Sequence, residues 1–141
     1  MNIQGMDPSI RSKGHYKLPY LKTFVELSQR NYPIIALTET WLNPSYTDAQ
    51  VHWHNFQCFR SDRIDRIRGG ALLYISNQIP ITKVECFNDD VIQSVVCLAP
   101  TNKMIIACVY KPPDASLNSF RSLIKFLQDF FDSIEDSDHY T

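Results

Sequence analysis

Five short apolar runs, each closed by turn-forming residues, constrain the fold of this chain more than any other feature of its sequence. They cover residues 34–38, 71–76, 81–86, 92–98 and 103–110. Short runs that are rich in β-branched residues are typical of strands, and strands that are apolar on both faces need cover on both sides. The connections between the last four runs are far shorter than a parallel crossover, so we expect antiparallel neighbours there.

Two further segments have helical spacing. Apolar side chains at positions 18, 21, 24, 25 and 27 fall on one side of a helical wheel, which predicts a helix over about 19–30. After Pro112 and Pro113, apolar residues step by three and four and predict a second helix, with Asp114 or Ser116 as its N-cap. The order of helix, strand, long loop, several strands and helix predicts a layered α/β sandwich.

Composition limits the domain count and the function classes. The 141 residues are 44% hydrophobic and 21% charged, with a net charge of −1, which is typical of one globular domain over 1–141. This near-neutral charge gives no general sign of nucleic-acid binding. No run approaches the length of a membrane span, and the N-terminus lacks the features of a signal peptide, so we expect a cytoplasmic or nuclear protein. The four cysteines form no C-x-x-C pair and predict neither disulfides nor zinc.

A few side chains could carry chemistry. Glu39 follows a buried strand, where a carboxylate can hold Mg²⁺, although its position alone favours an ordinary solvated acid. Residues 60–68 contain four arginines beside a glycine pair, and guanidinium groups suit phosphate oxygens. Asp62 and Asp65 lie between these arginines, so a loop with local ion pairs is an equal alternative. Tyr110, beside Lys111, could donate a hydrogen bond to a phosphate or could simply be a strand-end aromatic.

The order of these segments resembles a known family. I-I-A-L-T-E-T-W-L at 34–42, R-S-D-R at 60–63, G-G-A-L-L-Y-I at 69–75 and V-Y-K-P-P at 109–113 resemble the endonuclease/exonuclease/phosphatase superfamily. Within it, the likeness is to the endonuclease domains that precede reverse transcriptase in non-LTR retrotransposons, and it covers nearly the whole chain. The resemblance implies a four-layer, DNase I-like α/β sandwich with mostly antiparallel sheets. It also implies hydrolysis of DNA phosphodiesters with Mg²⁺, or with Mn²⁺ in its place.

The resemblance assigns roles to individual residues. Glu39 is similar to the metal-binding carboxylate of the family, and Tyr110 to the catalytic tyrosine that contacts the scissile phosphate. Asn2 resembles the asparagine that supports the metal site at the end of the first strand. The remaining candidates for binding phosphate or nucleic acid are basic residues, namely Arg60, Arg63 and Lys111.

The departures from the family pattern change the expected activity. No G-D-F-N string, whose Asp and Asn orient and deprotonate the attacking water, occurs in the sequence. Ser137-Asp138-His139 comes too early to be the family's terminal S-D-H motif and reads as the polar end of a helix, and Met1 leaves no room for a first strand. We therefore expect a partial domain, inactive alone, with an apolar sheet face and free strand edges that promote aggregation.

Two alternatives remain open from the sequence. The chain could be a phosphohydrolase whose missing groups come from another chain, such as the remainder of the domain or a reverse transcriptase. It could instead be a non-catalytic module that binds nucleic acid through the arginine-rich segment at 60–68. In the second case, binding depends steeply on salt and survives loss of the carboxylate at position 39.

Overall fold

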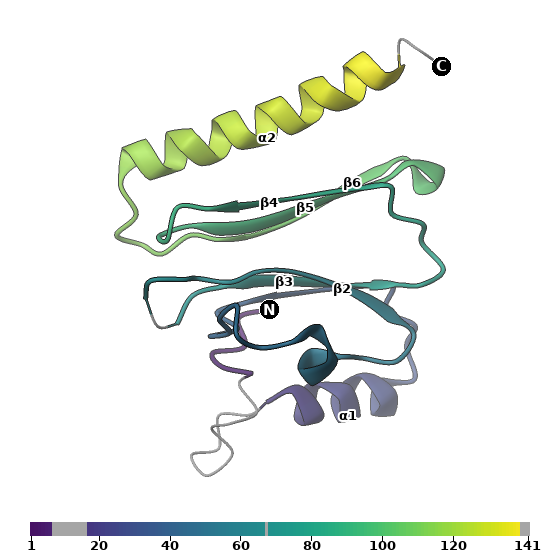
Figure 1. The fold of residues 1–141 in the computed structure, drawn as a ribbon. Helices are drawn as coiled ribbons and strands as arrows, with labels where there is room; N and C mark the ends of the chain where they lie inside the picture. Colours follow the sequence, from purple (N-terminus) through teal and green to yellow (C-terminus); the bar gives the residue numbers. More distant parts are fainter. Residues whose placement is uncertain (7–16, 67, 139–141) are drawn as a thin grey trace.

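The computed structural model describes residues 1–6, 17–66 and 68–138 (Figure 1). Two α-helices, six strands and two 3₁₀ turns follow one another along these parts of the chain. In order they are α1 (Leu18–Ser28), β1 (Ile34–Thr38), η2 (Asp48–Val51), β2 (Phe56–Ser61), β3 (Ala71–Ser76), β4 (Lys83–Asn88), β5 (Gln93–Ala99), η3 (Pro100–Asn102), β6 (Met104–Tyr110) and α2 (Leu117–Asp138).

The elements form four layers. One three-stranded sheet, called sheet A below, has the order β1-β3-β2, and the other, sheet B, has the order β4-β5-β6. All pairs of neighbouring strands are antiparallel. The two sheets face each other, with α1 on the outer side of sheet A and α2 on the outer side of sheet B (Figure 1). The predicted α/β sandwich with antiparallel sheets and flanking helices is confirmed.

The inner core lies between the two sheets. Alternate residues of each strand point into it, such as Leu73 and Ile75 of β3, which meet Val95 and Cys97 of β5 and Cys108 of β6. Every one of these side chains is buried. The expectation that an apolar sheet face would meet water is therefore wrong for this face, because each sheet covers the other.

A second core lies between sheet A and α1. Leu18 and Leu21 of α1 pack with Leu37 and Leu72 from the outer face of the sheet. Tyr74 belongs to the same cluster, and its hydroxyl donates to the carbonyl of Val51 at 2.6 Å. The faces of β3 are thus both apolar and both buried. The run at 34–38 was the strand predicted to be buried on both faces, but β1 is half-buried except for Leu37, because it lies at the edge of sheet A.

The structure corrects two of the expected connections. Residues 43–70 were predicted to be irregular, but β2 lies within them and pairs with β3 along its whole length. β3 and β4 were predicted to be neighbours, yet the chain between them passes from sheet A to sheet B. Ile79 and Ile81 on this connection pack in the inner core. The connection that passes from sheet A to sheet B therefore removes their apolar surface from water, which a tight hairpin would not do.

The cysteines, the apolar character of the helices and the start of α2 were also subjects of sequence-based predictions. All four cysteines are free thiols. Among the described helices, none has the length and apolar character needed to cross a membrane. Ser116, one of the two predicted N-cap residues, caps α2: its hydroxyl accepts a hydrogen bond from the backbone N–H of Ser119 at 3.1 Å.

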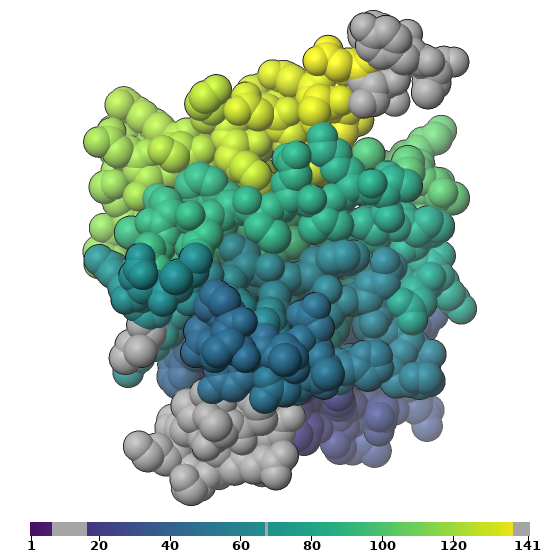
Figure 2. Space-filling model, viewed as in Figure 1, coloured from purple at the N-terminus to yellow at the C-terminus, as the bar shows by residue number. Residues whose placement is uncertain are grey.

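The helix α2 lies along the outer face of sheet B (Figure 1 and Figure 2). Leu123 and Phe130 are buried against the sheet, and Phe126 packs on Phe87 of β4 with ring centroids 5.5 Å apart. Phe120 and Ile124 of the same helix are exposed. Exposed apolar side chains also occur on the outer side of α1, at Phe24 and Leu27.

Adjacent phenylalanines of α2 provide a matched test of this packing. Phe130 is 0% exposed and Phe131 is 44% exposed. We expect Phe130→Ala to lower the free energy of unfolding by about 3–5 kcal/mol, because it removes a buried ring and leaves a cavity. Phe131→Ala should lower it by less than about 1.5 kcal/mol. Urea unfolding followed by circular dichroism measures both, and equal losses would contradict this docking of α2.

Candidate functional site

The two sheets bring Glu39 and Tyr110 into contact although the residues are 71 positions apart. Glu39 directly follows β1 of sheet A, and Tyr110 is the last residue of β6 in sheet B. The phenol of Tyr110 donates a hydrogen bond to Oε1 of Glu39 at 3.2 Å, and both residues are half-buried. Nearby, the Cys108 thiol donates to the carbonyl of Leu37 at 3.4 Å and joins the same two strands.

The backbone at Glu39 has an unusual conformation that fixes the direction of its side chain. Glu39 has a φ of 56° and Trp41 a φ of 60°, both in the left-handed region, which costs about 1 kcal/mol or more for a residue with a Cβ. The Glu39 N–H donates to Gly70 and the Trp41 N–H to Gly69, each at 2.9 Å. These hydrogen bonds hold the strained turn against the glycine pair.

The glycine pair is required by close contacts. Gly70 has a φ of +101°, and a Cβ on it would collide with the hydroxyl of Thr40, the buried residue between Glu39 and Trp41. A Cβ on Gly69 would lie 2.7 Å from the guanidinium carbon of Arg63. The two glycines therefore let other parts of the protein come close to this segment of the backbone.

Gln93 is a site-building residue that sequence reasoning missed. Its side chain is 0% exposed, and its Oε1 accepts the Gly70 N–H at 3.0 Å. Its amide nitrogen donates to Asn88 at 3.1 Å. Gln93 thus anchors the glycine pair, which in turn holds Glu39. The signal available in the sequence was a polar amide at the start of a strand that is otherwise apolar.

The N-terminal segment supports the same turn. Asn2 forms a parallel bridge with Thr38, and the Gly5 N–H donates to the carbonyl of Glu39 at 2.9 Å. Residues 1–6 therefore lie along the end of β1 through an isolated bridge and form no strand of their own. The sequence predicts a loop-like segment over 1–17, and residues 7–16 of it fall outside the described chain. Asn2 is exposed and lies beside Thr38, which precedes Glu39. The role of Asn2 in supporting a metal site stays a prediction.

Arg63 lies in the site and is 7% exposed. Its guanidinium carbon is 5.5 Å from the centroid of the Tyr110 ring, and its Nη2 donates to the carbonyl of Val91 at 2.8 Å. Its Nε is buried and has no hydrogen-bond partner. The predicted phosphate-binding arginine is therefore packed against the tyrosine rather than turned toward solvent.

The other two basic candidates differ in position. Arg60 points to the α1 side of sheet A, where its guanidinium lies 3.1 Å from Asp62 and 3.6 Å from Asp48. The structure does not bring Arg60 to the Glu39–Tyr110 pair, and the local ion pairs considered for this segment are present. Lys111 follows Tyr110 directly and is exposed, so it is the candidate that remains available to a ligand at this edge.

The electrostatic surroundings keep the Tyr110 phenol protonated. Burial raises the pKa of Tyr110 above its ordinary value, and the negative charge and hydrogen bond of Glu39 raise it further. Arg63 opposes this effect and lowers the pKa, but its contribution is smaller. At neutral pH the phenol is therefore a hydrogen-bond donor, available to Glu39 or to an anionic oxygen placed beside it.

The donor set suits a cation that is completed by substrate. Mg²⁺ often uses one or two protein carboxylates and fills its shell with water and phosphate oxygens. Glu39 offers one carboxylate, with Oε1 engaged by Tyr110. Within residues 1–6, 17–66 and 68–138, no three His, Cys, Asp or Glu side chains cluster to form a closed metal cage. The residues fit a magnesium site that depends on the substrate, and they do not fit a structural metal centre.

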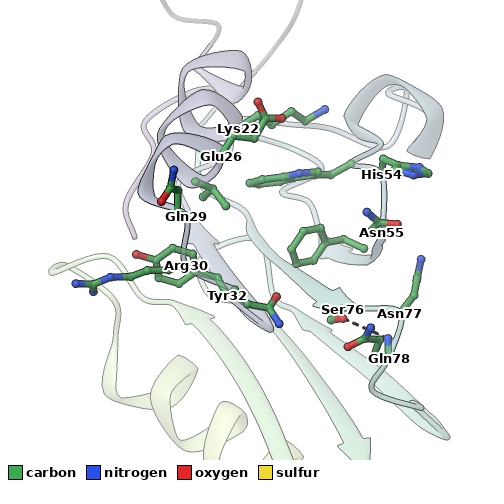
Figure 3. Close-up of a pocket in the computed structure, with 14 residues that line it drawn as sticks. Lys22, Glu26, Gln29, Arg30, Tyr32, His54, Asn55, Ser76, Asn77 and Gln78 are labelled. Carbon is green, nitrogen blue, oxygen red and sulfur yellow. Dashed lines mark hydrogen bonds between the residues drawn. The ribbon is translucent and has the colours of Figure 1, made fainter.

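A separate pocket lies at the opposite end of sheet A (Figure 3). It has a volume of about 700 Å³ and is bounded by the end of α1, the start of β2 and the turn after β3. Lys22, Arg30 and His54 are among its lining residues, and none of the predicted site residues is. Ser137 and Asp138 end α2, and His139 falls outside the described residues.

Comparison with known proteins adds no family assignment. No protein-family model matches this chain, and no curated protein matches it.

The contact between Gly70 and Thr40 can be tested by a double-mutant cycle. We expect Gly70→Ala to lower the free energy of unfolding by about 1–3 kcal/mol, because a Cβ would strain the backbone and strike the Thr40 hydroxyl. In a Thr40→Ala background the same change should cost about 1 kcal/mol less, since the hydroxyl is gone. Thermal and urea unfolding measure the four proteins. Strictly additive losses would contradict the close packing.

The hydrogen bond between Tyr110 and Glu39 predicts a pH dependence. Because the pKa of Tyr110 is raised above its ordinary value of 10.0, the stabilisation is complete below that pH and is lost as the pH rises through the raised pKa. At neutral pH, Tyr110→Phe should lower the free energy of unfolding by about 0.5–1.5 kcal/mol. The difference from wild type should shrink above about pH 10. A difference that grows with pH in urea unfolding would refute this.

Proposed function

We propose that this chain carries the metal-binding and phosphate-contacting part of a Mg²⁺-dependent phosphodiesterase site of the retrotransposon endonuclease type. The observation that carries the proposal is the 3.2 Å contact between Glu39 and Tyr110, two residues that the family resemblance singled out at widely separated motifs. A further support is the four-layer sandwich of two antiparallel sheets, which the same resemblance implies. The proposed ligand is DNA.

Each residue has a defined task in this site. The carboxylate of Glu39 holds the cation at the edge of the sandwich, and the strained turn at 39–41 fixes its direction. When a phosphodiester binds, the protonated Tyr110 phenol exchanges its Glu39 acceptor for a non-bridging phosphate oxygen, and Lys111 adds positive charge at the exposed rim. A bound Mg²⁺ would supply electrostatic stabilisation of the phosphoryl and leaving oxygens.

The sequence provides no counterpart of the family's water-activating residues. Hydrolysis needs a base positioned on the attacking water, and the sequence contains no G-D-F-N string to provide it. Asp89 and Asp90 are committed to backbone N–H groups: Asp89 accepts from Val91 and Ile92, and Asp90 accepts from Ile64 and Asp65. We therefore propose binding of a phosphodiester without hydrolysis by this chain alone.

Plasmid nicking tests the catalytic part of the proposal. Purified chain incubated with supercoiled plasmid and Mg²⁺ or Mn²⁺ should produce no more nicked circles than a sample without protein. Nicking that disappears with Glu39→Ala would contradict the proposal and show that the chain completes its own site.

Oligonucleotide binding tests the recognition part. Wild-type chain should bind a fluorescent DNA oligonucleotide more tightly with Mg²⁺ than with EDTA, and Glu39→Gln should abolish that difference. Asp48→Asn is the matched control, since Asp48 lies on the α1 side of sheet A and leaves Glu39 intact. Binding that is equal in wild type and Glu39→Gln, with a steep salt dependence, would favour the non-catalytic module instead.

A further inference from the structure

We propose that Arg63 is a positioning residue, which holds the Tyr110 ring against Glu39, and that it does not contact the phosphate itself. Its effect on ligand binding rests on the proposed function, whereas its effect on Tyr110 rests on the structure alone. The proposal reverses the sequence-based role of Arg63 as a phosphate or nucleic-acid contact.

The position of the guanidinium carries this inference. Arg63 is 7% exposed, and its guanidinium carbon lies 5.5 Å from the centroid of the Tyr110 ring. Its Nη2 donates a hydrogen bond to the carbonyl of Val91, in the turn between β4 and β5. Because its Nε is buried and unpaired, this part of the guanidinium faces protein rather than an open binding surface.

The charge of Arg63 is balanced in an unusual way. A buried guanidinium is normally paired with a carboxylate. Among the described residues, the ion pairs formed by arginine are those of Arg60, and none involves Arg63. The face of the Tyr110 ring and the Val91 carbonyl are what it meets instead, and both attract a cation. The tyrosine is thus the electrostatic partner of the arginine as well as its neighbour.

The glycine pair leaves room for this arrangement. An added Cβ on Gly69 would lie 2.7 Å from both Cζ and Nε of Arg63 and 2.7 Å from Oε1 of Gln93. The guanidinium therefore fills the space that the missing side chain leaves. The same corner holds the Glu39 backbone, so Arg63 links the position of the tyrosine to that of the carboxylate. Without Arg63, the ring loses one of its supports and the phenol leaves Oε1 of Glu39.

Fluorine NMR tests this positioning directly. With 3-fluorotyrosine placed at position 110, Arg63→Met should shift the ¹⁹F resonance, and the shift should be smaller in a Glu39→Ala background, where the phenol has no carboxylate acceptor to lose. Lys111→Gln, an exposed change beside the tyrosine, should leave the resonance in place. Gly69→Ala, which pushes on the guanidinium, provides a second route to the same shift if Arg63→Met does not fold. An unchanged resonance in a folded Arg63→Met or Gly69→Ala protein would overturn the proposal.

The salt dependence of oligonucleotide binding separates positioning from direct phosphate contact. Removing a phosphate contact lowers the slope of log affinity against log salt by about 1. Arg63→Met should weaken binding by about tenfold with an unchanged slope, whereas Lys111→Gln should reduce the slope. A reduced slope for Arg63→Met would overturn the proposal. If wild type binds no oligonucleotide, the proposed function fails, and the fluorine result still decides the role of Arg63.

Discussion

The packing of sheet A on sheet B is the interaction on which the rest of the structure depends. Leu73 and Ile75 of β3 are buried on Val95 and Cys97 of β5, and this contact aligns the ends of β1 and β6. Glu39 and Tyr110 meet because Glu39 directly follows β1 and Tyr110 is the last residue of β6. Burial between the sheets therefore stabilises the domain and assembles the candidate site at the same time.

The site is built from a strained turn and several supports that are not themselves reactive. Glu39 adopts a left-handed backbone conformation because the glycine pair and the N-terminal segment accept and donate the hydrogen bonds around it. Gln93 fixes the glycine pair from sheet B, and Arg63 fills the space beside it. Strain of this kind persists where surrounding contacts determine the backbone more strongly than its intrinsic preference does.

Local patterns predicted most elements correctly. β1 was predicted with its observed ends, and the helical spacing after Pro112 predicted α2 because one apolar stripe suffices to define an amphipathic helix. β2 was missed since it mixes polar and apolar side chains without an apolar run and leads into a segment rich in arginine. The role of Arg60 was misjudged for a related reason: the sequence shows nearby charges but not which face of the sheet they share.

The sequence by itself determined the class of the fold, the order of all its main elements except β2, and the identity of the acid and the phenol as candidates, because periodicity and motif spacing are local properties. Only the tertiary structure decided that β3 and β4 belong to different sheets, that Arg63 is buried behind Tyr110, and that Gln93 and the N-terminal segment support Glu39. These outcomes depend on contacts between residues far apart in the chain. Such contacts form where they let the whole fold bury its apolar side chains, and no single segment of the sequence specifies them.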